Sequence, residues 1–305
     1  MTATTRLPPT ETRLEASLGL DEMTTLELLT LMNEQDRVAV EAVAAVLPQL
    51  AELVEVAAGA VRAGGSIHYF GAGTSGRLGV LDAAELLPTY NLPDHIVVGH
   101  IAGGERALVH AVENSEDSAV DGAQAAAALG PDDVAIGLAA SGNTPYVGGA
   151  LETARAQGAA TALISCNPHA VLAPLADLNI VLRTGAEVVT GSTRLKAGSA
   201  QKLAINGFST ALMVALGRTW SNLMVSVVAT NDKLRDRSIR IFREATERLG
   251  DPVEDAAARA SLAAADGDLR VAIVAQVGGV DARRARAVLE STGFSVRDAI
   301  RLVQE

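Results

Sequence analysis

The sequence predicts an α/β protein with a doubly wound, five-stranded parallel sheet and flanking helices. Additional helices precede the sheet, and a small helical module follows it. Five short apolar runs follow one another through the centre of the chain, and helical stretches separate most of them. Buried-looking strands that alternate with helices are typical of a parallel sheet covered on both faces. Both ends of the chain show helical periodicity instead.

The five runs that we expect to be strands are SIHYFGAG, HIVVGHI, DVAIGLAA, TALISC and NIVLRT. Helical patterns lie at residues 76–87, 144–157 and 171–175, and a longer one covers about 196–216. Before the strands, the pattern from about residue 24 to 64 is helical, with a break near Pro48 and a Gly-Gly stop.

Shifts in composition predict four segments. Residues 1–54 form an N-terminal helical segment, and residues 55–225 contain the predicted sheet. Residues 226–250 form a connecting helix. After the tripeptide GDP, three short helices separated by glycine-containing turns make a C-terminal module over residues 251–305.

Composition and charge exclude several kinds of partner. The chain has 305 residues, of which 49% are hydrophobic, so it can bury a sizeable core. Its net charge of −11 argues against a nucleic-acid partner. No run reaches the roughly 18 apolar residues of a membrane span, and no signal peptide is visible. The single cysteine and five scattered histidines show no metal-ligand spacing. We expect a cytoplasmic protein without a metal.

The stretch GAGTSG, residues 71–76, has the glycine spacing of a dinucleotide-binding loop. A Rossmann site also needs an acidic residue at the tip of the second strand, and that strand ends in His100 and Ile101. The spacings of a nucleophile elbow and of a P-loop are absent as well. The hydroxyls of Thr74 and Ser75 at a helix start favour the phosphate of a small molecule instead.

A second hydroxyl-rich loop, SGNT at residues 141–144, follows the third predicted strand. Loops at the carboxyl ends of parallel strands can converge on one crevice. A phosphorylated small molecule such as a sugar phosphate therefore fits both loops. The predicted phosphate-binding residues are Gly73, Thr74, Ser75, Ser141, Gly142, Asn143 and Thr144.

A third group of polar residues stands where the long helix near residue 196 begins. Ser192, Thr193, Arg194 and Lys196 form a pattern typical of a helix cap and also receptive to an anion. A cap with solvated basic residues stays open as the alternative. Substrate contact is the favoured interpretation for Ser192, Thr193 and Lys196, with Glu187 as a candidate acceptor for a sugar hydroxyl.

Five strings resemble those of N-acetylmuramic acid 6-phosphate etherases, a bacterial group within the sugar isomerase (SIS) domain superfamily. They are GAGTSGRLGVLDAAE, AASGNTPY, SCNP, AEVVTGSTRLKAGSAQK and NLMVSVVATNDKL. The resemblance covers about residues 10–248, and a more distant one is to the vertebrate glucokinase regulatory protein. It implies an SIS-type fold, a homodimer, and neither a metal nor a cofactor.

The resemblance also implies a reaction in the recovery of peptidoglycan amino sugars. The D-lactyl ether of N-acetylmuramic acid 6-phosphate is lost by ring opening, removal of the C2 proton, departure of lactate from C3 and addition of water. The implied proton donor is Glu85, and the second active glutamate is Glu116. The chain departs from the family pattern at Leu86-Leu87, where Cys-Pro is usual, and at Asn143, where arginine is common.

The residues alone leave open which glutamate is the acid and which is the base. Apolar neighbours of Glu85 and acidic neighbours of Glu116 both favour the protonated carboxyl. Glu85 also lies ten residues after Ser75, or about 15 Å along an unbroken helix. This distance exceeds the separation of phosphate and C3 in a hexosamine phosphate. Either the helix bends near Gly79, or the site is built across the interface of a homodimer, which we expect.

Two other functions stay open at this point. A sugar phosphate isomerase on the same fold would need a base but no acid for a leaving group. A non-catalytic, sugar-phosphate-binding regulator is the other alternative, although the acidic N-terminal helices give no helix-turn-helix signal. The presence of both matched glutamates favours an enzyme, a carbon–oxygen lyase.

Overall fold

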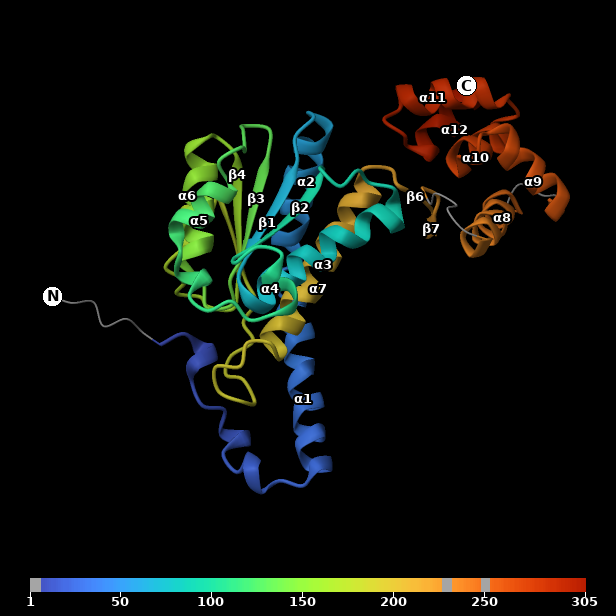
Figure 1. Ribbon diagram of the computed structural model, residues 1–305. Helices are drawn as coiled ribbons and strands as arrows, with labels where there is room; N and C mark the ends of the chain where they lie inside the picture. Colours follow the sequence, from blue (N-terminus) through green and yellow to red (C-terminus); the bar gives the residue numbers. More distant parts are fainter. Residues whose placement is uncertain (1–6, 227–231, 248–252) are drawn as a thin grey trace. The chain divides into compact units, whose positions relative to one another are not determined.

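The computed structural model describes residues 7–226, 232–247 and 253–305, and it divides into two compact units (Figure 1). The first unit comprises Met1–Ala84 and Asp94–Ser209, and the second comprises Glu85–Pro93 and Thr210–Glu305. The string VVATN and the whole tripeptide GDP of the predicted boundary lie outside the described residues. The division into four segments stays a prediction.

The first unit is built on a five-stranded parallel sheet with the order β2-β1-β3-β4-β5. Each strand coincides with one of the five predicted apolar runs, so the predicted α/β sheet is confirmed. The strands are β1 (Ile67–Gly71), β2 (Val97–Ile101), β3 (Val134–Leu138), β4 (Ala160–Ser165) and β5 (Leu178–Val181).

The strand order reverses between β1 and β3. From β1 the chain passes outward to β2, and from β3 it passes the other way to β4 and β5. Ligands of open α/β sheets bind outside the carboxyl ends of the strands at such a point. Gly71 at the end of β1 pairs in register with Leu138 at the end of β3, so the loops that follow these strands start side by side.

Helices cover both faces of this sheet (Figure 1). On one face, α5 and α6 pack together over a cluster that includes Phe70, Tyr146 and Leu163. On the other face, Tyr69 meets Phe208 of α7 edge-on, with 6.4 Å between ring centroids. The helices are α1 (Thr25–Ala44), α2 (Leu47–Arg62), α3 (Gly73–Tyr90), α4 (Arg106–Val109), α5 (Ala119–Ala125), α6 (Pro145–Ala156) and α7 (Lys196–Ala215).

The predicted helices of this unit are mostly confirmed, with local corrections. The break near Pro48 falls at residues 45–46, and Pro48 stands in the first turn of α2, where its missing N–H costs no bond. The predicted helix at 171–175 is only the 3-10 turn η5 (Ala173–Leu175). No single described helix is long and apolar enough to cross a membrane, although α1 and α2, bent by 56°, satisfy the length and composition together.

The second unit contains a short hairpin and a helical module. The hairpin pairs β6 (Thr219–Trp220) with β7 (Leu223–Met224). Four helices, not the three predicted, follow residue 252, because α9 precedes the bundle of α10, α11 and α12. Asp268, Asp281 and Ser295 cap the last three helices. The helices are α8 (Asp232–Glu247), α9 (Asp255–Ala264), α10 (Leu269–Gly278), α11 (Ala282–Ser291) and α12 (Val296–Gln304).

The only tryptophan of the chain, Trp220, lies in β6 of the second unit. The guanidinium carbon of Arg297, on α12, lies 5.4 Å from the centroid of the indole ring. This cation–π contact joins the hairpin to the C-terminal bundle.

Candidate active site

The loop after β1 turns sharply into α3, and its glycines make that turn. Gly73 has a φ of +53°, in the left-handed region that favours glycine. A Cβ on Gly76 would lie 2.6 Å from the carbonyl oxygen of Gly71, so the start of the helix approaches the end of the strand too closely for any side chain. The glycine spacing is therefore explained by backbone packing and needs no dinucleotide.

The hydroxyl residues of this loop face the start of α7. Ser75 is buried, and its hydroxyl donates a hydrogen bond of 2.7 Å to Oε1 of Gln201 on α7. A Cβ on Gly198, also on α7, would lie 3.4 Å from Cγ2 of Thr74. The first turns of α3 and α7 are thus in direct contact, and they bring two helix N-termini together.

The loop after β3 is held by its own polar groups. Gly142 has a φ of +70°, and a Cβ there would lie 2.3 Å from Cβ of Ala170. The backbone N–H of Asn143 donates to Oγ of Ser141 at 3.2 Å. The side-chain oxygen of Asn143 accepts from the backbone N–H of Val171 at 3.0 Å. Asn143 thus supports the loop, where the resembling family often has an arginine.

Asn167, just after β4, is a site-supporting residue that the sequence interpretation missed. It is buried, and its side-chain nitrogen donates to the carbonyl oxygen of Ser141 at 2.8 Å. Its side-chain oxygen accepts from the backbone N–H of His169 at 2.9 Å. The sequence did contain a signal for this role, because Asn167 directly follows a predicted strand and precedes a proline. Thr144 stands at the N-cap of α6, without a side-chain cap bond.

Glu187 provides the cap of α7, a role that the sequence interpretation gave to the residues following it. The carboxylate is fully buried and accepts from the backbone N–H groups of Ala197 at 2.9 Å and Lys196 at 3.3 Å. Burial raises the pKa of Glu187, and these two hydrogen bonds act against that rise. Because α7 begins at Lys196, the helix cap that was the alternative for Ser192 and Thr193 is provided by Glu187 instead.

Lys196 is nearly fully buried and reaches to α1. Its ammonium nitrogen donates to the side-chain oxygen of Gln35 at 2.5 Å. Burial lowers the pKa of Lys196, while the carboxylates of Glu187 and Asp36 raise it. The amino group of Lys196 therefore lies inside the fold at the base of α7, next to the loop that carries Ser192 and Thr193.

Glu116 lies on a separate loop of the first unit. It is the middle residue of the 3-10 turn η4 (Ser115–Asp117), is exposed, and follows Asn114, which has a φ of +59°. Arg77 of α3 joins the segment before Glu116 to the helix that follows the loop after β1. Its Nε donates to the carbonyl oxygen of Leu108 at 3.1 Å and a terminal nitrogen donates to that of His110 at 3.2 Å.

Glu85 lies on the same helix as the first loop. α3 continues through Gly79 as a single helix to Tyr90, with Pro88 inside it. The separation of Glu85 from Ser75 therefore stays at about 15 Å along the axis. Glu85 is exposed, whereas the neighbouring Leu86 is buried. The apolar residues that adjoin Glu85 in the sequence therefore do not bury its carboxyl, contrary to what the sequence predicted.

The structure brings most predicted first-unit residues to three adjoining segments. These are the loop after β1, the loop after β3 and the start of α7 with its preceding residues. Glu116 lies on its own loop, and Glu85 belongs to the second unit. The predicted residues in the three segments are Gly73, Thr74, Ser75, Ser141, Gly142, Asn143, Thr144, Glu187, Ser192, Thr193 and Lys196.

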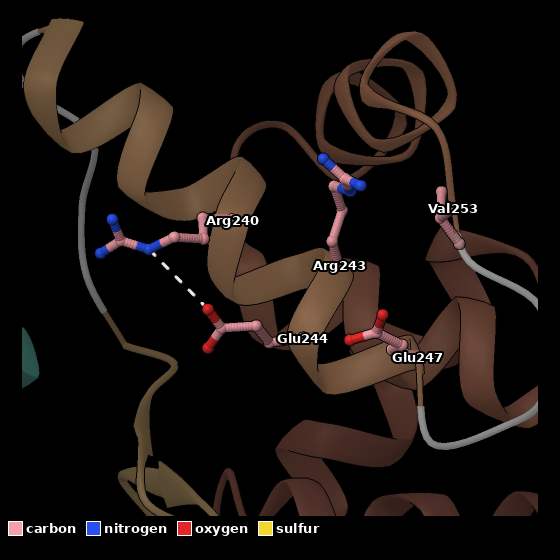
Figure 2. Close-up of a pocket in the computed structure, with 5 residues that line it drawn as sticks. All are labelled: Arg240, Arg243, Glu244, Glu247 and Val253. Atoms are coloured by element: carbon pink, nitrogen blue, oxygen red, sulfur yellow. Dashed lines mark ion pairs between the residues drawn. The ribbon is translucent and has the colours of Figure 1, made fainter.

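A hollow of about 210 Å³ in the second unit is lined by none of these residues (Figure 2). In it, Nε of Arg240 lies 3.9 Å from a carboxylate oxygen of Glu244, and both side chains are exposed. Paired surface charges of this kind contribute little and leave little attraction for an anion. Within the described ranges, no group of three or more His, Cys, Asp or Glu side chains is arranged to hold a metal ion.

Comparisons with known proteins agree with the fold and the strings quoted above. The chain matches the glucokinase regulatory protein N-terminal SIS domain over residues 49–155 and the SIS domain over residues 109–211. A phosphoheptose isomerase from Francisella tularensis shares the fold, with a TM-score of 0.51, 18% identity, and coverage of 62% of this chain and 98% of that one. The SIS-type fold is thereby confirmed.

Two curated relatives cover nearly the whole chain. N-acetylmuramic acid 6-phosphate etherase of Thermobifida fusca (strain YX) is 53% identical over 266 residues, which are 87% of this chain and 86% of the relative. The protein of the same name from Cutibacterium acnes is 48% identical over 98% of both chains. The names of these relatives agree with the function that the quoted strings imply.

Proposed function

The chain belongs to the N-acetylmuramic acid 6-phosphate etherase family, and we propose that Glu85 and Glu116 carry its reaction on a substrate anchored between β1 and β3. The protein is a carbon–oxygen lyase that converts N-acetylmuramic acid 6-phosphate and water to N-acetylglucosamine 6-phosphate and D-lactate. Relatives at 46–53% identity carry this name, whereas the likeness to the isomerase, at 18% identity, concerns the fold alone.

The proposed steps account for every proton and bond. In the ring-opened aldehyde, the base takes the C2 proton, and the electron pair passes toward the C1 carbonyl. The C3–O bond then breaks, and the lactyl oxygen takes a proton from the acid. Water finally adds its hydroxyl to C3 and a proton to C2, and proton exchange with solvent returns the base and the acid to their starting forms. Each positioned acid or base typically contributes about 10²–10⁴ in rate, and the resemblance assigns the acid role to Glu85.

The observation that carries the proposal is that the loops after β1 and β3 start side by side, where the strand order reverses. The starts of α3 and α7 meet there, and backbone N–H groups at helix N-termini attract an anion. Because the side-chain oxygen of Asn143 is engaged with Val171, we propose that backbone groups and hydroxyls, not an arginine, hold the phosphate.

We also propose that the chain acts as a homodimer in the cytoplasm, with the site at the subunit interface. Two features support a second copy. The carboxyl of Glu85 is exposed and lies far along α3 from the phosphate loop. Figure 1 shows α1 projecting from the sheet, and its Leu26, Leu29 and Val40 are 75%, 57% and 57% exposed. A protein surface that covered both would desolvate the acid.

Isotope tracing tests the proposed function. The protein is incubated with N-acetylmuramic acid 6-phosphate in H₂¹⁸O, and both products are examined by mass spectrometry. We expect unlabelled lactate and one ¹⁸O at C3 of the amino sugar. Absence of lactate would overturn the etherase assignment, and label in lactate would overturn the elimination route.

Mixed dimers test the shared site. A Glu85→Ala subunit is mixed with a subunit inactivated in the phosphate loop, for example by Ser75→Ala with Thr74→Ala. If the site is shared, one of the two sites in each mixed dimer combines an intact loop from one subunit with an intact Glu85 from the other. Activity should then reappear. Inactive mixtures that contain verified heterodimers would count against it.

A further inference from the structure

The buried carboxylate of Asp82 joins three elements of the first unit. The side chain is 4% exposed and lies on the inner side of α3. Its Oδ2 accepts from the hydroxyl of Tyr69 in β1 at 3.0 Å. Its Oδ1 accepts from the side-chain nitrogen of Asn206 at 2.6 Å and the hydroxyl of Ser209 at 3.0 Å, both on α7. No part of the phosphate-binding scheme above uses this network.

A carboxylate in this place is costly as a packing element. Burial raises the pKa of Asp82, and hydrogen bonds from Ser209, Asn206 and Tyr69 act against that rise. An apolar side chain would fill the same space without the desolvation penalty. Unlike an apolar side chain, the carboxylate imposes a geometry. Its oxygens accept these hydrogen bonds only when α3 has one particular rotation and register relative to α7 and β1.

Asp82 lies on the helix that carries Glu85, three residues earlier in the chain. On a regular α-helix this offset is about 4.5 Å along the axis and about 60° around it. Between Glu85 and the end of α3, Pro88 lacks the N–H that would bond to the carbonyl of Ala84. The helix is therefore less constrained after Glu85. Before Glu85, the hydrogen bonds of Asp82 attach the helix to β1 and α7.

We propose that Asp82 is a positioning residue for the acid of the reaction. By fixing the rotation and register of α3 against α7 and β1, it sets where the carboxyl of Glu85 stands relative to the leaving lactyl oxygen. A misplacement of about 1 Å can cost on the order of 10²-fold in rate. This inference rests on the proposed function, in which Glu85 protonates that oxygen.

The test separates the acid step from the preceding base step. In D₂O, removal and return of the C2 proton places deuterium in unreacted substrate, whereas lactate appears only when the C3–O bond breaks. The quantity measured is the ratio of C2 exchange in recovered substrate to lactate release. We expect Asp82→Asn to raise this ratio about tenfold or more, because lactate release slows while exchange continues.

A purely structural role would leave this ratio unchanged. Fewer folded molecules lower exchange and lactate release by the same factor, so an unchanged ratio in Asp82→Asn overturns the inference. Ser66→Ala is a matched control, since it removes a different side-chain hydrogen bond to an aspartate, Asp133, at the amino end of the sheet. Its ratio should equal that of the wild type.

Two further variants keep the test decisive if Asp82→Asn fails to fold. Ser209→Ala and Tyr69→Phe each remove one hydrogen bond to Asp82 and should raise the ratio by smaller factors. Wild-type ratios in both would overturn the inference. Glu85→Gln separates failure of this inference from failure of the proposed function. If that variant releases lactate at the wild-type rate, Glu85 is not the acid, and this result does not depend on Asp82.

Discussion

The two ends of the parallel sheet use polar side chains in opposite ways. At the amino end, Oδ1 of Asp133 accepts from both the backbone N–H and the hydroxyl of Ser66, each at 2.7 Å. The Ser66 hydroxyl lies 2.8 Å from Nε2 of His68. Nδ1 of His68 lies 2.8 Å from Nε2 of His100, which stands near the carboxyl end of β2. At the carboxyl end, small and hydroxyl residues surround two helix starts.

The difference between the two ends indicates which substitutions should change stability without changing activity, and which should change activity more than stability. The amino-end network satisfies its members internally, so changes there should alter the free energy of unfolding and spare the reaction. The carboxyl end carries glycines and hydroxyl residues at the point where the strand order reverses. Of these, Gly73 is exposed, and Thr74, Ser141 and Thr144 are half-buried. Changes there should alter substrate binding or rate more than stability, except where a glycine conformation is involved.

The largest expected effect comes from the two glutamates. Glu85→Gln should lower lactate release by about 10²–10⁴ while C2 exchange persists, because only the acid is lost. Glu116→Gln should lower both. Both side chains are exposed, so the midpoint of thermal unfolding should stay near that of the wild type. A Glu85→Gln enzyme that loses exchange and lactate release equally would contradict the assignment of acid and base.

A smaller effect, on both stability and binding, is expected for Gly142→Ala. The left-handed φ alone costs about 1–2 kcal/mol for a side chain, and the contact with Ala170 adds to it. Urea unfolding should show this loss, and the KM should rise because the loop after β3 moves.

Gly59→Ala in α2 is the matched control for this substitution. No atom lies within 4 Å of the added Cβ there, and the change should stabilise the protein by about 0.5–1 kcal/mol. An unchanged KM in Gly142→Ala would argue against a role of this loop in binding.

At the opposite end, Ser66→Ala should cost about 1–3 kcal/mol of stability, because Asp133 and His68 each lose a partner. The kcat per folded molecule should stay at the wild-type value. A fall in kcat larger than the fall in folded protein would break the contrast between the two ends of the sheet.

The smallest effect is a dependence of stability on pH. Burial, with the neighbouring His68, lowers the pKa of His100 from 6.5 to about 4. Between these values the unfolded chain binds a proton that the native chain does not, so stability should fall as the pH drops from about 6.5 toward about 4. Thermal unfolding across this range measures it.

His100→Gln should flatten the decline, and His95→Gln, at an exposed position, should not. A slope of the opposite sign in the wild type would show that the imidazoles are charged in the native state.

The sheet and most helices could be predicted because their signals are local. Apolar runs bounded by glycine and polar residues located all five strands within a few residues. The same reasoning failed where the pattern was brief: α4 and α5 were not predicted, and the helix expected at 171–175 is only one 3-10 turn. Short helices have too few turns to show periodicity.

The site could be predicted only as a set of loops. Resemblance supplied the glutamates, and small hydroxyl residues marked the loops, but the supporting contacts join distant residues. Asp82 meets its α7 partners across more than 120 positions of sequence, and Gln201 meets Ser75 across 126. Glu187 was a candidate for substrate, yet both of its oxygens accept backbone N–H groups of α7. No local pattern encodes such pairings.

The single tryptophan gives the chain a built-in optical probe. Because Trp220 lies in the second unit under the guanidinium of Arg297, its fluorescence reports the melting of that unit alone. Far-ultraviolet circular dichroism instead averages over the helices of both units. Coincident curves from the two methods would indicate one cooperative transition, and separated curves would give each unit its own denaturation midpoint.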